Sequence, residues 1–172
     1  MNWPLRAFAM TLAAAALWPE LQRYRAEWWL GEADARLEAA LGGTLKGSAA
    51  LSSTADALQL TQQAMPVLSG DPRPVQAGSV ALLLLHRGGE AIALLEPAIA
   101  KGERPELTLN LGRARGITGN EKGADAAFLR TAWANPAAIA TLPKTMRGPL
   151  LERVKELELQ LHEGRLQQPP PL

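Results

Sequence analysis

The sequence predicts an all-α protein: a short array of helical hairpins with an apolar helix at the N-terminus and a capping helix near the C-terminus. Two observations indicate helices. Apolar residues recur at helical spacing, and cap, proline and glycine signals divide the chain into short segments. A third excludes strands, because no segment between turn signals alternates strictly between polar and apolar residues.

Composition narrows the class of protein further. The 172 residues carry 18 Lys and Arg against 17 Asp and Glu, and they include no Cys. This length suits one domain with a short appendage. The absence of Cys excludes thiolate nucleophiles, Cys-ligated zinc and iron–sulfur clusters. A net charge of +1 offers no broad positive field, so we expect no nucleic-acid partner.

Residues 1–19 are predicted to be an apolar membrane anchor or a signal. The run Ala7–Trp18 carries no charge, follows Arg6, and is bracketed by Trp3 and Trp18, as interfacial anchors often are. Twelve helical residues reach only about 18 Å, however, against a hydrocarbon core of about 30 Å. A secretory signal cleaved near 14–16 and a buried Ala-rich helix therefore stay open as alternatives. An anchor or a signal would place the bulk of the chain in the periplasm.

Residues 20–70 are predicted to form a helical N-terminal region, which could include a degenerate repeat. Pro19 suits the first turn of a helix, and that helix should continue to Leu41. Leu21, Tyr24 and Trp28 follow 3,4 spacing, and Leu37 and Leu41 continue it, so these residues are expected on its apolar face.

A loop rich in small residues is expected over 42–52, before a second helix. Ser53–Asp56 has the S-x-x-D form of a capping box, so it predicts a helix start at that point. Pro66 and the Ser69-Gly70 pair should close this helix.

Residues 71–148 are predicted to form paired helices. Asp71 and Asn135 each precede a proline, which is a cap followed by a favoured first helical residue. We expect helices over 72–87, 90–101, 105–119 and 121–134, with Asn120 as the cap of the last and Gly88-Gly89 as the stop of the first.

Within this region, Pro105–Pro136 resembles one tetratricopeptide repeat. The positions that carry the likeness are Leu111, Gly112, Gly119, Ala124, Phe128 and Pro136. Gly112 and Ala124 are small, as a close approach of two antiparallel helices requires, and Phe128 would fill the gap to a neighbouring helix pair. A weaker copy precedes it, since Ala91, Leu95 and Ala98 lie 33 residues before Ala124, Phe128 and Thr131.

The likeness has three departures. Thr108 stands where the family usually has an aromatic residue, Arg115 replaces a second aromatic residue, and Thr131 replaces an alanine. They put individual contacts in doubt more than the architecture. The resemblance implies a short α-solenoid without chemistry of its own.

The C-terminal part is predicted to be a capping helix over 149–164 and a Pro-rich disordered tail over 165–172. Pro149 should open the helix, and Leu150, Val154, Leu157 and Leu161 form one apolar stripe on an otherwise charged surface. Repeat arrays need such caps at their ends.

Side chains that could carry chemistry are sparse. His86 and His162 lie at helix ends without other ligands at metal spacing, so we expect no metal and no cofactor. The glycines at 112–123 lack the order of a phosphate-binding loop, and no nucleophile motif occurs. We therefore expect no catalytic residues and no enzymatic activity.

The resemblance implies a concave groove lined by the first helices of successive repeats. It places Glu106, Leu109, Asn110, Arg113 and Ile117 toward a protein or peptide partner, with Asn110 and Arg113 suited to a peptide backbone or a carboxylate. The expected function is a membrane-tethered scaffold for protein–protein interaction in a bacterial envelope assembly, such as a polysaccharide, pilus or secretion apparatus. The alternative is a small structural subunit, permanently buried in a larger membrane complex through Trp28, Trp29 and the Leu150–Leu161 stripe. The partner and the oligomeric state stay open.

Overall fold

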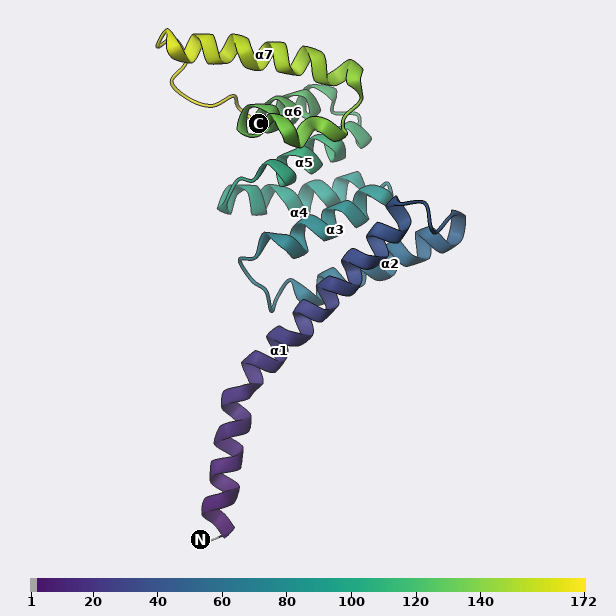
Figure 1. Ribbon diagram of the computed structural model, residues 1–172, viewed down its shortest axis with the longest axis vertical. Helices are drawn as coiled ribbons and strands as arrows, with labels where there is room; N and C mark the ends of the chain where they lie inside the picture. The colour runs from purple at the N-terminus through teal and green to yellow at the C-terminus, as the bar shows by residue number, and fades with distance from the viewer. Residues whose placement is uncertain (1–2) are drawn as a thin grey trace. The chain divides into compact units, whose positions relative to one another are not determined.

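The structure, a computed structural model, describes residues 3–172, apart from the side chains at 4–6, 8, 9 and 14. The described residues form an all-α fold without strands, which confirms the predicted class (Figure 1). The elements are α1 (Trp3–Leu41), α2 (Gly47–Ala64), α3 (Pro72–Leu84), α4 (Gly88–Lys101), α5 (Pro105–Ile117), α6 (Glu121–Ala134), the 3-10 helix η1 (Pro136–Thr141) and α7 (Lys144–His162).

The chain divides into two compact units, one ending at Ala77 and one beginning at Gly78. The first contains α1, α2 and the start of α3. The second contains the end of α3 and every later element.

In the first unit, α2 packs against the C-terminal part of α1. α1 has 39 residues and α2 only 18, so α2 can cover only part of it. The buried face of α1 consists of Ala26, Leu30, Ala33 and Leu37, at 4,3,4 spacing. α2 meets it with small side chains that include Ala57, Thr61 and Ala64. Small residues on both faces let the two backbones approach closely.

The predicted apolar face of α1 was wrong at four of its five residues. Leu37 is buried, whereas Leu41 is 62% exposed. Leu21, Tyr24 and Trp28 are 50%, 72% and 60% exposed. The stripe that includes Ala26 and Ala33 is buried instead. Hydrophobicity favours the aromatic stripe, but alanines allow a closer helix–helix contact, and contact geometry decides which face is buried.

The prediction of a membrane anchor at residues 1–19 was also wrong. Among the described residues, no helix combines the length and the apolar character needed to cross a bilayer. The expected periplasmic localisation and envelope setting rested on that anchor. The alternative of a buried helix does not hold either, because the described side chains between residues 7 and 18 are exposed. Met1 and Asn2 and the side chains of Arg6 and Ala14 lie outside the described part of the chain.

The helix starts predicted at Pro19 and Pro149 differ from the structure. α1 continues through Pro19, and α7 begins at Lys144, before Pro149. Pro97 also lies inside a helix, α4. A proline removes the hydrogen bond to the carbonyl four residues earlier. All three prolines, and the residues four positions before them, are exposed, so water can satisfy the freed carbonyls.

The predicted capping box at Ser53–Asp56 was wrong as well. α2 begins at Gly47, and both Ser53 and Thr54 lie inside it and are buried. The Thr54 hydroxyl donates to the Ala50 carbonyl at 2.8 Å, one turn back along the helix. A Thr that bonds backward in this way can sit within a helix as well as at its start.

The caps predicted at Asp71, Asn120 and Asn135 are confirmed. Asp71 accepts a hydrogen bond from the Arg73 amide, Asn120 from Gly123, and Asn135 from Ala137, at 2.9, 3.0 and 3.1 Å. Each accepts through its side-chain oxygen, so each satisfies an amide at a helix N-terminus that has no partner within the helix.

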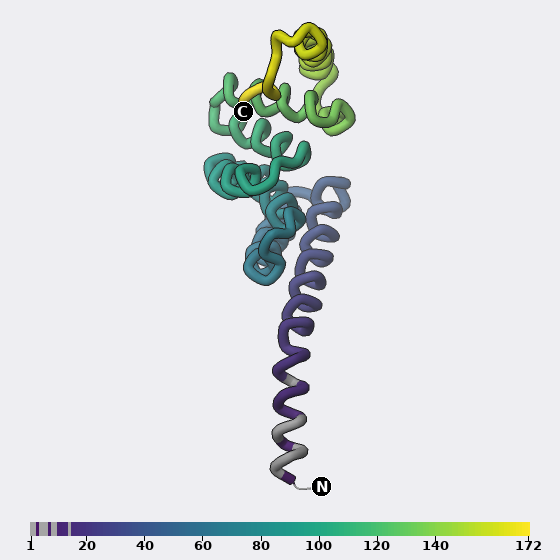
Figure 2. Tube along the Cα trace, turned by 90° about the vertical axis from the view of Figure 1, so that its left-hand side faces the viewer, coloured from purple at the N-terminus to yellow at the C-terminus, as the bar shows by residue number. Residues whose placement is uncertain are grey.

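In the second unit, α4, α5 and α6 lie side by side in chain order, and α7 packs on α6 (Figures 1 and 2). The core between α5, α6, η1 and α7 is apolar and contains Leu109, Ala124, Phe128, Leu129, Ala132, Ile139, Leu142, Leu150 and Val154. Of the stripe predicted on the last helix, Leu150 and Val154 are buried, whereas Leu161 is 50% exposed.

Two glycines permit close helix contacts in this unit. A Cβ on Gly112 would lie 2.4 Å from Cε1 of Phe128, so α5 presses against the Phe128 ring of α6. A Cβ on Gly88 would lie 2.9 Å from the Ala114 carbonyl oxygen. Gly88 therefore serves helix packing at the start of α4, and it does not stop the preceding helix.

α3 is ended by His86. The His86 amide donates to the Leu83 carbonyl and the Arg87 amide to the Leu82 carbonyl, at 3.0 and 2.8 Å, which is the hydrogen-bond pattern of a Schellman cap. This cap places His86 at φ +56°, a left-handed conformation that usually favours glycine.

We expect Gly112→Ala to lower the free energy of unfolding by about 1–3 kcal/mol, because overpacking a core costs that much. Gly116→Ala in the same helix is the matched control. Its Cβ meets nothing within 4 Å, so we expect a gain of about 0.5–1 kcal/mol from helix propensity. Urea unfolding followed by circular dichroism measures both. Equal effects of the two substitutions would contradict the close approach of α5 to Phe128.

We expect His86→Gly to raise the free energy of unfolding by about 0.5–1 kcal/mol, because glycine relieves the left-handed strain. His86→Ala keeps the Cβ and should leave stability nearly unchanged. Thermal unfolding of the three proteins distinguishes backbone strain from a contribution of the imidazole. A loss of stability in His86→Gly would count against backbone strain at this position.

Candidate functional site

The candidate site lies on α5, and it is built around a chain of polar side chains. The Asn110 amide Nδ2 donates to the Ser79 hydroxyl at 2.9 Å, and both side chains are buried. The Asn110 carbonyl oxygen Oδ1 accepts from Nη1 of Arg113 at 3.2 Å. Arg113 in turn donates from Nη2 to the Thr141 hydroxyl at 2.6 Å. These hydrogen bonds therefore link α3, α5 and η1 within the second unit.

Arg113 is the charged group among these hydrogen-bonded side chains. Its side chain is half-buried, and burial lowers the pKa of the guanidinium below its ordinary value. No carboxylate within the described part of the protein forms an ion pair with it. A guanidinium keeps its charge at neutral pH, so Arg113 is a partly desolvated cation held by two neutral groups. Such a cation gains from a carboxylate or phosphate ligand.

The structure places the five predicted partner-binding residues in different surroundings. Glu106 and Ile117 are exposed, and Arg113 is half-buried. Asn110 is 4% exposed, and both ends of its amide already have partners, so it positions Arg113. Leu109 is 7% exposed and belongs to the core. The predicted set thus contains surface, positioning and core residues.

Sequence reasoning missed two of these hydrogen-bonded residues, Ser79 and Thr141. The sequence predicted no binding role for either of them. Neither lies in a motif. Both become relevant only because the packing of α3 and η1 brings them to α5.

The three departures from the tetratricopeptide pattern have specific contacts. Thr108 and Thr131 share a hydroxyl–hydroxyl hydrogen bond of 2.9 Å between α5 and α6, and both are fully buried. Arg115 donates to the Gly123 carbonyl at 3.2 Å and to Glu96 at 3.1 Å. It thereby joins α4, α5 and α6. Polar contacts hold these helices together at the positions where the family has aromatic or small residues.

The positions of the possible metal-binding side chains also matter for the chemistry of the protein. Among the residues that the structure describes, His, Asp and Glu do not gather in groups of three that could hold a metal ion. His86 and His162 both lie at helix C-termini and are exposed.

Comparisons with protein-family models, with curated proteins and with solved structures found no match to this chain.

Proposed function

We propose that the protein is a non-enzymatic interaction module: a short array of tetratricopeptide-like helical hairpins that binds an acidic segment of a partner protein. The stacking of α4, α5 and α6 and the glycine-mediated contact at Phe128 support the repeat-like architecture.

The observation that carries the proposal is the state of Arg113. Its guanidinium is partly removed from water, fixed by Asn110 and Thr141, and lacks a carboxylate partner within the described residues. A rigid planar fork of this kind binds a carboxylate with two parallel hydrogen bonds. Because Arg113 is already held in place, little side-chain entropy remains to be lost when a ligand binds.

We expect Arg113→Ala to weaken binding of a fluorescein-labelled tetraglutamate-containing peptide by about tenfold or more, since a hydrogen bond to a charged group contributes about 1.5–3 kcal/mol. Fluorescence anisotropy measures the affinity. A peptide with Gln in place of Glu tests for charge. Arg153→Ala, at an exposed arginine of α7, is the matched control. Equal affinity of the Glu and Gln peptides, or of the two variants, would contradict the proposal.

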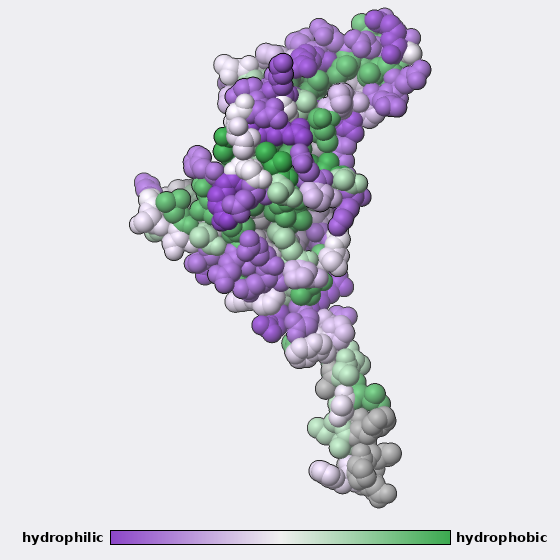
Figure 3. All heavy atoms as spheres, turned by 180° about the vertical axis from the view of Figure 1, so that it is seen from behind, coloured by the Kyte–Doolittle hydropathy of each residue, from purple (hydrophilic) through white to green (hydrophobic). Residues whose placement is uncertain are grey.

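A second candidate function is a structural subunit that is held in a complex through α1. The observation that favours it is the set of exposed large apolar side chains along that helix, at Trp3, Met10, Leu12, Leu17, Trp18, Leu21, Tyr24 and Trp28. Figure 3 shows hydrophobic residues at the surface of its N-terminal part. An apolar surface of this extent is typical of a protein interface.

If α1 is an interface, we expect the isolated full chain to self-associate, because no partner subunit buries its exposed apolar side chains. Size-exclusion chromatography with light scattering measures the mass. Trp18→Gln combined with Leu21→Gln should reduce association, whereas Leu51→Gln, at a 55% exposed leucine of α2, should not. A monomeric wild-type chain at all concentrations would count against this candidate.

A further inference from the structure

The C-terminal tail folds back onto α6. α7 ends in a second Schellman cap: the Gly164 amide donates to the Leu161 carbonyl at 3.0 Å and the Arg165 amide to the Gln160 carbonyl at 2.9 Å. Gly164 has φ +70°, which reverses the direction of the chain. The tail was expected to be solvated, but Pro170 is buried.

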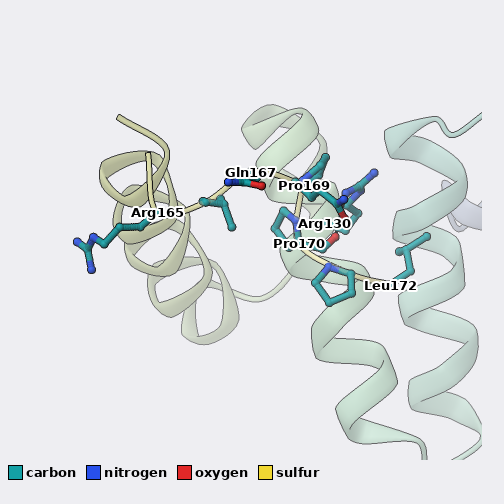
Figure 4. Close-up of a pocket in the computed structure, with 9 residues that line it drawn as sticks. Arg130, Arg165, Gln167, Pro169, Pro170 and Leu172 are labelled. Carbon is teal, nitrogen blue, oxygen red and sulfur yellow. Dashed lines mark hydrogen bonds between the residues drawn. The ribbon is translucent and has the colours of Figure 1, made fainter. Parts of the chain in front are cut away.

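Arg130 of α6 is the residue that receives the tail. Its Nη1 donates to the Pro170 carbonyl at 2.9 Å. Nε and Nη2 donate to the two carboxylate oxygens of Glu103 at 2.6 and 2.5 Å. Glu103 thus fixes the guanidinium plane and leaves the third nitrogen directed at the tail. Figure 4 shows Arg130 beside Pro169 and Pro170, with Arg165 pointing away.

The surface around Arg130 combines apolar side chains with the Glu103–Arg130 ion pair. Pro169 lines a small cavity together with Pro105, Trp133 and Ala134, as well as Glu103 and Arg130. Trp133 also packs against the core, so it is held in place. An ordered aromatic ring next to a single hydrogen-bond donor suits a proline-rich segment. Such a segment presents flat rings and backbone carbonyls but few amides, and its extended form costs little entropy to bind.

We propose that Arg130, Trp133, Glu103 and Pro105 form a binding site for a proline-rich extended segment of another protein, which the chain's own Pro169–Pro171 occupies as an intramolecular competitor. The leash from Gly164 to Pro169 is short, so the tail has a high effective concentration at the site. A partner segment must displace it. The site is separate from Arg113 and does not depend on the proposed acidic ligand.

The test uses full-length protein and a fluorescein-labelled peptide with the sequence of residues 165–172. A tail-release variant, in which Pro169, Pro170 and Pro171 are replaced by Gly, keeps the chain length and vacates the site. We expect it to bind the peptide at least tenfold more tightly than the wild type, as measured by fluorescence anisotropy. A peptide with Ala in place of the three prolines should bind at least tenfold more weakly.

Two substitutions in the tail-release background identify the site. Arg130→Lys keeps the charge but cannot pair with Glu103 and a carbonyl through one planar fork, so we expect an affinity loss of about tenfold. Glu103→Gln should reduce affinity less, because it only loosens Arg130. Arg153→Lys, at an exposed arginine of α7, should leave affinity unchanged. Circular dichroism verifies that each variant is folded.

Three outcomes would overturn the proposal: equal affinity of the wild type and the tail-release variant, equal binding of the proline and alanine peptides, or an undiminished affinity in folded Arg130→Lys. Each would mean that the tail only packs against α6 as part of the fold.

Discussion

The second unit depends on the distance between α5 and α6, and that distance is set where Gly112 faces the ring of Phe128. Because glycine has no Cβ, the ring can lie against the α5 backbone. This close approach brings Thr108 within hydrogen-bond distance of Thr131 and lets Leu109 reach the core shared with η1 and α7. The same packing positions η1 so that Thr141 can fix Arg113. The local absence of one carbon atom thus has consequences along the whole of α5.

The sequence predicted the helices best where a side chain makes a local hydrogen bond. Asn120 and Asn135 mark starts in the structure because their caps involve only neighbouring amides. Prediction failed for prolines, because a helix accepts a proline where water can reach the freed carbonyl. Pro19 and Pro149 read as helix starts, yet both lie inside helices, because their freed carbonyls face water. The buried face of α1 could not be found from hydrophobicity, since the identity of the packing partner decided for alanine over the larger side chains.

The candidate site was predictable only in part. Arg113 could be singled out as a fork suited to carboxylates, but its partly buried state follows from the packing of α5 against η1. Leu109 was assigned to the groove through a family resemblance, and the structure buries it in the core. The seat of the tail on Arg130 joins segments 40 residues apart. No local pattern in the sequence reports such a contact, because the proline run by itself predicts only an extended conformation.

The hydroxyl pair in the core of the α5–α6 hairpin has a consequence for how the two helices align. Apolar side chains can slide past one another at modest cost, whereas the hydrogen bond between the two hydroxyls forms in one alignment only. Each hydroxyl also contacts a carbonyl of its own helix, Thr108 at Pro105 and Thr131 at Ala127. A slip by one helical turn would therefore leave each hydroxyl with a hydrogen bond to its own helix, but the bond between the two hydroxyls would be lost. The pair thus favours the native alignment of α5 and α6 by one hydrogen bond, and shifted alignments stay accessible during folding.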